Sequence, residues 1–284
     1  MDQKHELKLL KRATAGDVSA QLMLGRNFEC TQQYVEAAQW YRLAADHGSV
    51  AAETNLGSLF ADGLGVQRDD SEAFKLYLRA AGSGFGPAEN NVAIMYYNGR
   101  GTPKSVEAAA SWFARAVGHR YYPAYAALAK QYLDGRGVST DSNRAFRLFH
   151  EAAEHGVVSA QENLALLFGH GIGTQPDTAK AVEWNLKAIA AGSVFAENNL
   201  GYLYEHPGDG LTPDLAQAAI WYRRAADHGL PQAAYNLALL YRDGRGVQQN
   251  SDESSRLFAQ AASHGFTATA FAGRTIASAN ATQK

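Results

Sequence analysis

Residues 88–96 read Ala-Glu-Asn-Asn-Val-Ala-Ile-Met-Tyr. Ala88 is followed by an aliphatic residue at i+4, a small residue at i+5 and an aromatic residue at i+8, which places all four on one face of an α-helix. The same order recurs along the chain, and we interpret it as one element of a repeated unit. The other copies are Ala52, Leu56, Gly57, Phe60; Ala124, Leu128, Ala129, Tyr132; Ala160, Leu164, Ala165, Phe168; Ala196, Leu200, Gly201, Tyr204; and Ala233, Leu237, Ala238, Tyr241.

Two sets of glycines repeat with one period. Gly-x-Gly loops follow the helical stretches at Gly63/Gly65, Gly99/Gly101, Gly135/Gly137, Gly171/Gly173, Gly208/Gly210 and Gly244/Gly246. Terminal glycines stand at Gly48, Gly84, Gly156, Gly192, Gly229 and Gly265. Their spacing is 36 residues or a multiple of 36, except for one step of 37. Two independent markers with one period predict a chain built from repeats.

A second helix is expected between each Gly-x-Gly loop and the next terminal glycine. Asp or Asn often precedes it, as suits an N-cap, and a glycine after its end suits the left-handed conformation that terminates helices. The expected N-caps are Asp69, Asp141, Asp177, Asp214 and Asn250. A large apolar residue eight positions before the terminal glycine is predicted to fill the core. These residues are Trp40, Leu76, Trp112, Leu148, Trp184, Trp221 and Leu257.

These patterns predict an all-α solenoid of antiparallel helix pairs, because a single pair cannot bury both of its apolar faces. The expected organisation is one solenoid domain over residues 1–284. It begins with a capping helix at 5–19 and continues with seven repeats at 20–266. A C-terminal capping helix and a frayed tail are expected at 267–284.

The repeat reads Ala-x3-Leu-Gly-x2-Tyr, then Gly-x-Gly-Val, then Ala-x2-Trp-Tyr-x-x-Ala-Ala-x-x-Gly. This pattern resembles the Sel-one-like repeat family, a relative of the tetratricopeptide repeats, over nearly the whole chain. The resemblance implies a right-handed superhelix whose first helices line a concave groove. Members of that family, many of them bacterial, are adaptors and scaffolds for protein complexes, and some oppose bacterial toxins.

The chain departs from the family pattern at three places. The first unit lacks the Gly-x-Gly loop, so Gly16 and Gly48 lie only 32 residues apart and its helices should meet more tightly. Arg120 replaces a terminal glycine, and Gly118 is a candidate to relieve that turn. The third loop has Thr102 where valine is usual.

Composition and charge exclude several classes of function. The 26 basic and 28 acidic residues give a net charge of −2 without a basic cluster, so nucleic acid is not an expected partner. Cys30 is the only cysteine, which leaves no disulfide framework and no multi-cysteine zinc site. No stretch approaches the roughly 20 apolar residues of a membrane span. No signal peptide is recognised, so a cytoplasmic location is expected.

Residue types that often support catalysis fit structural roles here. The Gly-x-Gly loops lie between helices, unlike a nucleotide-binding fingerprint, which follows a strand. Five histidines stand just before a helix end, where they can meet free carbonyl groups. They are His47, His119, His155, His228 and His264. No metal-ligand spacing, catalytic triad or phosphate-binding loop can be assembled. We therefore expect no enzyme activity, no metal and no cofactor.

Partner specificity is expected where the repeats differ from one another. If first helices line the groove, residues two before and two or five after the core aliphatic residue face it. These are Asn90, Ile94, Tyr97, Lys130, Leu133, Glu162, Leu166, Asn198, Tyr202, Glu205, Tyr235, Leu239 and Arg242. Tyrosine and arginine are enriched among the residues that contribute most to protein interfaces. This set is the predicted partner-binding surface.

A row of asparagines directly precedes the core aliphatic residue of the first helix. Its members are Asn55, Asn91, Asn163, Asn199 and Asn236. One interpretation is a ladder of amides that hydrogen-bonds the backbone of an extended partner peptide, since an amide offers both donor and acceptor. The other is that each amide ties its helix to the loop of the adjacent unit, and we favour this structural role.

The main functional hypothesis is an adaptor or scaffold, monomeric on its own, that binds another protein or a peptide segment in its groove. One alternative is a toxin-neutralising immunity or inhibitor protein of a bacterial competition system. Such a protein would use the same surface to bind one enzyme tightly. An enzyme is the less favoured alternative.

Overall fold

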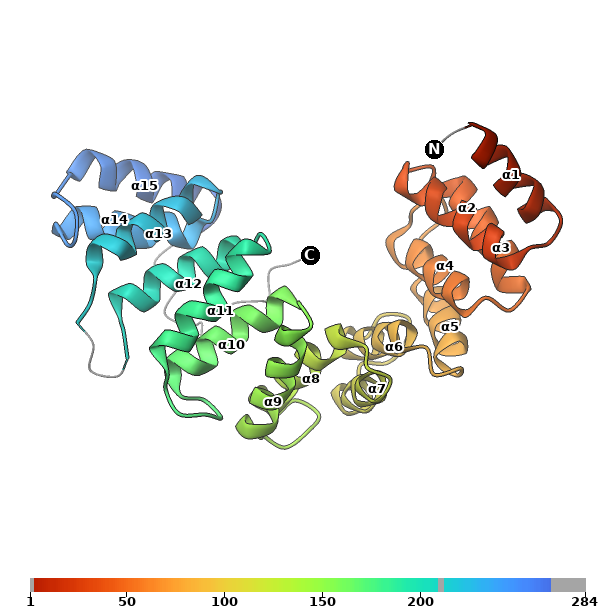
Figure 1. Ribbon diagram of the computed structural model, residues 1–284, viewed down its shortest axis with the longest axis horizontal. Helices are drawn as coiled ribbons and strands as arrows, with labels where there is room; N and C mark the ends of the chain where they lie inside the picture. Colours follow the sequence, from red (N-terminus) through yellow and green to blue (C-terminus); the bar gives the residue numbers. More distant parts are fainter. Residues whose placement is uncertain (1–2, 209–211, 267–284) are drawn as a thin grey trace. The chain divides into compact units, whose positions relative to one another are not determined.

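The structure, a computed structural model, describes residues 3–208 and 212–266, which form fifteen α-helices and no β-strand (Figure 1). The helices are α1 (Gln3–Thr14), α2 (Val18–Cys30), α3 (Tyr34–Asp46), α4 (Val50–Asp62), α5 (Asp70–Ala81), α6 (Gly86–Asn98), α7 (Val106–Gly118), α8 (Tyr122–Asp134), α9 (Ser142–Glu154), α10 (Val158–His170), α11 (Thr178–Ala190), α12 (Val194–Glu205), α13 (Leu215–Asp227), α14 (Pro231–Asp243) and α15 (Ser251–Ser263). The all-α prediction is confirmed. In the expected N-terminal capping segment, α1 ends at Thr14 rather than at residue 19. The expected C-terminal cap and tail, 267–284, lie outside the described residues.

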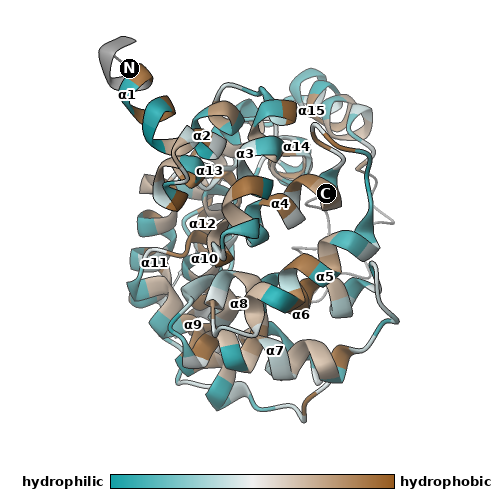
Figure 2. Cartoon of the chain, turned by 90° about the vertical axis from the view of Figure 1, so that its right-hand side faces the viewer, coloured by the Kyte–Doolittle hydropathy of each residue, from teal (hydrophilic) through white to brown (hydrophobic). Residues whose placement is uncertain are grey.

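The chain divides by its contacts into two compact units. The first comprises Met1–Leu128 and Arg136–Ser139, and the second comprises Ala129–Gly135 and Thr140–Lys284. Within a repeat, the two helices pack together: α2 on α3, α4 on α5 and α6 on α7 in the first unit, and α10 on α11, α12 on α13 and α14 on α15 in the second. Each first helix also packs on the preceding second helix, as α4 does on α3 and α12 on α11. Apolar and polar residues alternate along the helices (Figure 2), as expected where each helix buries one face.

The second glycine of a Gly-x-Gly loop lies against the preceding repeat. Gly65 has φ of 67° and Gly101 has φ of 64°, values that favour glycine. A Cβ at Gly65 would clash with the backbone of Tyr34, at the start of α3. A Cβ at Gly101 would clash with the backbone of Asp70, at the start of α5. The loop glycines therefore serve both the turn and the close approach of neighbouring repeats.

The expected N-caps are confirmed. The side chain of each accepts a hydrogen bond from a backbone N–H in the first helical turn, which contributes about 1 kcal/mol per helix. The N-caps are Asp69 on α5, Asp141 on α9, Asp177 on α11, Asp214 on α13 and Asn250 on α15.

The turn after α7 differs from the expectation. Gly118 is the last residue of α7, and Arg120 itself adopts the left-handed conformation, with φ of 56°. Because Gly118 does not take the positive φ, it does not relieve the turn. The Arg120 N–H bonds to the carbonyl of Val117 at 2.9 Å, so the helix ends as in the other repeats at the cost of a non-glycine residue in that conformation.

The predicted tryptophan and leucine core position is only partly correct. Trp184, Leu76 and Leu257 are buried, whereas Trp40, Trp112, Leu148 and Trp221 are half-buried. The more consistently buried position is the next one along the helix. It holds Tyr41, Tyr77, Phe113, Phe149, Asn185 and Tyr222, all buried, and Phe258, which is half-buried. A cation also lies over three of the tryptophan rings, with Arg115 over Trp112, Lys187 over the buried Trp184 and Arg224 over Trp221.

We call this buried position of the second helix the inner position. Its residue type follows the small residue on the first helix of the same repeat. Glycine accompanies tyrosine in Gly25/Tyr41, Gly57/Tyr77 and Gly201/Tyr222, and alanine accompanies phenylalanine in Ala93/Phe113, Ala129/Phe149 and Ala238/Phe258. A Cβ at Gly57 would lie 2.8 Å from the Tyr77 ring, so the tyrosine needs the glycine. The remaining repeat pairs Ala165 with Asn185.

Candidate binding surface and cavity

One position of the first helix is exposed or half-buried in every repeat, and its residue type differs from one repeat to the next. It lies six residues after the first alanine of the helical pattern, and we call it the variable row. The row contains Arg26, Ser58, Ile94, Lys130, Leu166, Tyr202 and Leu239. Ile94 is 39% exposed and Tyr202 is 38% exposed. Because the residue type changes from repeat to repeat while Ile94 and Tyr202 reach solvent, this row is a candidate contact surface.

In the first unit, the predicted surface residues on α6 separate into two kinds. Ile94 projects to solvent, and Tyr97 is half-buried, with its hydroxyl accepting a hydrogen bond from Arg136 Nη1 at 2.6 Å. Asn90 is only 8% exposed, so it is withdrawn from the surface that the sequence predicted it to line.

In the second unit, the predicted residues on α8 and α10 are half-buried. They are Lys130, Leu133, Glu162 and Leu166. The Glu162 carboxylate accepts a hydrogen bond from the Ser193 hydroxyl, which also caps α12. Burial raises the pKa of Glu162 above its ordinary value, and the Ser193 hydrogen bond opposes that rise. Glu162 therefore ties two repeats together as well as lying at the predicted surface.

The predicted residues on α12 and α14 form two clusters. Glu205 accepts a hydrogen bond from the Tyr222 hydroxyl at 2.9 Å and pairs with Arg245 at 3.1 Å. Burial and the adjacent Glu205 carboxylate raise the pKa of Tyr222 above its ordinary value. Tyr235 packs its ring against Phe258 and Phe266.

The other four predicted residues of this pair of helices differ in exposure. Leu239 and Asn198 are half-buried, and Arg242 is exposed and pairs with Asp243 at 2.7 Å. Tyr202 and Arg242 are thus the predicted residues that project furthest from this part of the second unit.

The asparagine row does not form a uniform ladder. Asn236 Nδ2 donates to Asn198 Oδ1 at 3.2 Å, which joins α14 to the helix α12 of the adjacent repeat rather than to the loop that the structural interpretation expected. Asn163 Nδ2 instead donates to the Ser159 carbonyl of its own helix at 2.7 Å. Asn55 and Asn91 are half-buried, and Asn199 lines a cavity.

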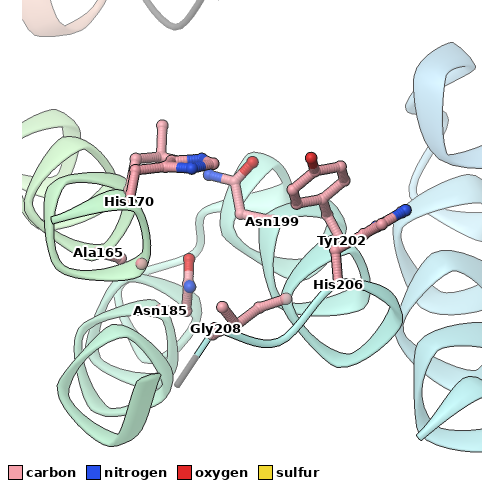
Figure 3. A pocket seen from close by; sticks show the side chains of 10 residues that line it. Ala165, His170, Asn185, Asn199, Tyr202, His206 and Gly208 are labelled. Carbon is pink, nitrogen blue, oxygen red and sulfur yellow. The ribbon is translucent and has the colours of Figure 1, made fainter. Parts of the chain in front are cut away.

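That cavity, of about 270 Å³, lies in the second unit between α10, α11 and α12 (Figure 3). Its floor holds Asn185, and its rim holds His170, Tyr202 and His206. The Tyr202 ring stacks on the His206 ring, with centroids 4.6 Å apart. The centroid of the His170 ring lies 6.5 Å from that of Tyr202. Sequence analysis missed this site. The available signal was Asn185, which interrupts the row of aromatic residues at the inner position.

The helix-ending histidines support structure in two ways. His47, His119 and His228 reach the first helix of their own repeat, where Nδ1 bonds to Gln21 at 3.0 Å, Glu89 at 2.7 Å and Glu197 at 2.8 Å, respectively. His155 and His264 bond to helix carbonyl groups, as predicted. Arg115 and Arg224 complete the partners of the buried Glu89 and Glu197 carboxylates.

Residues 3–208 and 212–266 contain no group of three or more histidine, cysteine, aspartate or glutamate side chains placed to hold a metal ion. No described helix is both long enough and apolar enough to span a membrane.

Comparison with known proteins identifies the repeat. A family model described as the Sel1 repeat matches residues 18–49, 50–85, 86–117, 123–157, 158–193, 194–230 and 231–266. No curated protein matches the chain.

Solved structures share the fold. A Sel1 repeat protein from Oxalobacter formigenes is 25% identical, with a TM-score of 0.76 over 85% of this chain and 96% of that one. A protective antigen present in uropathogenic Escherichia coli strains, with an SLR fold, is 26% identical, with a TM-score of 0.75 over 91% of this chain. The match spans 56% of the length of the Escherichia coli chain. An immunity protein from Pseudomonas aeruginosa, at 16% identity and a TM-score of 0.48, is too distant to bear on function.

Proposed function

Because the chain belongs to the Sel1 repeat family, whose repeats generally mediate protein–protein interactions, we propose that it is an adaptor that binds a protein partner through the exposed face of its first helices. The variable row carries this proposal. Its position is exposed or half-buried in all seven repeats, and it presents the side chains of Ile94 and Tyr202 to solvent. Tyrosine in particular is a typical anchor of protein interfaces.

The buried and the accessible polar side chains together favour binding over catalysis. Buried carboxylates such as Glu89 and Glu197 are already paired with arginine and histidine inside their own repeats. They are therefore committed to holding helix pairs together. The side chains left accessible on the first helices are mixed apolar, aromatic and charged groups, which suit a protein surface better than a reaction centre. The proposed adaptor works without a metal or cofactor.

Tyr202 in the second unit is the residue whose loss should weaken binding most. Its ring is 38% exposed and is held in place by stacking on His206, so its orientation costs little entropy when a partner binds. The matched control is Ile220 on α13, a second-helix residue that is 52% exposed.

The test begins with affinity capture of partners from the native lysate by the wild-type chain and by the Tyr202→Ala and Ile220→Ala variants. A captured partner is then purified, and its affinity for each chain is measured by calorimetry. The proposal expects Tyr202→Ala to weaken binding at least about ten-fold, which is the effect of an interface anchor, while Ile220→Ala changes little. The opposite result would move the interface to the second helices. A captured partner that is a toxic enzyme, inhibited by the chain, would identify an immunity role for the same surface.

A further inference from the structure

The cavity in the second unit arises where two side chains are small at the same time. In the repeat of α12 and α13, the residue nine positions after the first alanine, Glu205, contacts the residue at the inner position, Tyr222, through a hydrogen bond at 2.9 Å. The corresponding pair in the repeat of α8 and α9 is Leu133 with Phe149. In the repeat of α10 and α11, these positions hold Gly169 and Asn185. The space that an aromatic ring fills elsewhere is therefore left as a cavity of about 270 Å³.

The floor of this cavity offers a hydrogen-bond acceptor. Asn185 is 2% exposed, and its Nδ2 donates to the Ala181 carbonyl at 3.0 Å. Because a carbonyl can only accept, this bond fixes the amide orientation and turns Oδ1 toward the cavity (Figure 3). Oδ1 has no hydrogen-bond partner within the described part of the chain. A buried acceptor in this state favours a ligand that brings an O–H or N–H donor.

The rim and walls favour an uncharged aromatic group. The rings of His170 and Tyr202 lie on opposite sides of the cavity in Figure 3, and Leu166 and Leu203 supply apolar walls. The described lining residues include no carboxylate to pair with an ammonium or guanidinium group. A buried cation would therefore lose its hydration without compensation, whereas an aromatic ring with one donor would lose little.

We propose that this cavity receives the side chain of a tyrosine from the protein partner, whose phenol hydroxyl donates to Asn185 Oδ1. The occupant supplies from outside the ring that Phe113, Phe149 and Phe258 supply from within the other repeats that have alanine on the first helix. The inference rests on the proposed function, because Leu166 and Tyr202 belong both to the variable row and to the cavity lining. It adds the identity of the anchor residue in the partner.

The first test uses p-cresol, which is the tyrosine side chain as a free molecule, and toluene, which lacks the hydroxyl. Each is titrated into the full chain, and backbone and side-chain amide signals are followed by nuclear magnetic resonance. The expected result is a saturable shift centred on Gly169, the Asn185 amide and Gly208, with toluene binding about ten-fold more weakly because it leaves Oδ1 unpaired. Equal binding of the two probes, or no saturable shift, overturns the proposal. Tighter binding of 3-methylindole than of p-cresol also overturns it, in favour of tryptophan.

Two variants control the result. Asn185→Phe recreates the alanine and phenylalanine pairing of the other repeats, so it is expected to fold and to lose p-cresol binding through occupation of the cavity. Asn185→Leu replaces the amide by an apolar side chain that has no acceptor. The preference for p-cresol over toluene should therefore disappear. Retention of the preference in Asn185→Leu would overturn the role of Oδ1.

The outcome is separable from that of the adaptor proposal. Binding of a partner that depends on Tyr202 but is unaffected by Asn185→Phe would leave the adaptor surface in place and reject the cavity as its anchor site. For a partner that does use the cavity, changing its anchoring tyrosine to phenylalanine should weaken binding about ten-fold to the wild-type chain and not to Asn185→Leu.

Discussion

The ring of Tyr222 lies directly against Gly201, so that a Cβ at Gly201 would come within 2.7 Å of Tyr222 Cδ1. The Tyr222 hydroxyl is in turn held by Glu205, the last residue of the same helix as Gly201. The glycine permits the close approach of α12 and α13, and the hydrogen bond fixes the ring in the space that the glycine leaves. The close packing of the Tyr222 ring and the hydrogen bond of its hydroxyl therefore depend on each other.

Gly201→Ala should destabilise the protein. The added methyl group overpacks a tightly filled site at about 1–3 kcal/mol, and the better helix propensity of alanine returns about 1 kcal/mol. We expect a net loss of about 1 kcal/mol in urea unfolding followed by circular dichroism. Gly118→Ala is the control, because nothing lies within 4 Å of a Cβ there. The double variant Gly201→Ala, Tyr222→Phe recreates the Ala238/Phe258 pairing and should cost less than the sum of its parts; additive losses would contradict the proposed coupling.

Trp184→Ala and Trp221→Ala should differ in cost although both residues stand at the same repeat position. Trp184 is buried, so its truncation should cost about 3–5 kcal/mol. Trp221 is half-buried beneath Arg224, so its truncation should cost about half as much. Unfolding of the two variants under identical conditions checks this difference. Because a cation also lies over the Trp184 ring, equal losses would mean that the difference in burial does not set the cost of truncation.

The repeat itself could be predicted from the sequence because its signals are local and recur in register. Helical spacing after Ala88, the N-caps such as Asp141 and the glycines at helix ends each depend on a few neighbouring residues. The inner position was harder to identify. Trp221 and Tyr222 are adjacent on one helix, and which of the two faces the core depends on how closely the partner helix approaches.

The cavity was missed for a related reason. It depends on Gly169 and Asn185 together, and these residues lie on different helices with no short-range pattern to connect them. The burial of Asn90 could not be predicted from the sequence either. Its place on the helical wheel suggests an accessible face, whereas packing against other helices buries it. Comparing all repeats position by position would have shown the missing aromatic residue, but the cavity also required the packing of three helices.

Asp70 should contribute stability that depends on pH. The hydrogen bond from Arg100, followed by that from Arg68, lowers the pKa of Asp70 to about 2, below its ordinary value of 3.8. Since the folded pKa is the lower one, the contribution is present above pH 3.8 and is lost as the pH falls toward about 2. Asp70→Asn should therefore cost about 1 kcal/mol at neutral pH, after allowance for solvent screening, and almost nothing near pH 2.

The measurement for Asp70 is the free energy of unfolding of wild type and Asp70→Asn across this range. Arg68→Met is the control, because Arg68 is more exposed and its pairing with Asp70, at 3.1 Å, is longer than the 2.6 Å pairing of Arg100. If wild type still has the larger free energy of unfolding near pH 2, the charge of the Asp70 carboxylate is not the source of the difference.

Asn185→Phe should raise stability while it closes the cavity. The substitution removes a buried acceptor without a partner, fills empty space with apolar atoms and restores the pairing with an alanine that Ala93/Phe113 and Ala238/Phe258 already show. We expect a gain of about 1–2 kcal/mol in the free energy of unfolding. Asn185→Ala, which enlarges the cavity, is the matched control and should give no gain. If Asn185→Phe instead destabilises the fold, the Asn185 amide is required for packing, and the cavity is a by-product of that requirement rather than a site kept open for a ligand.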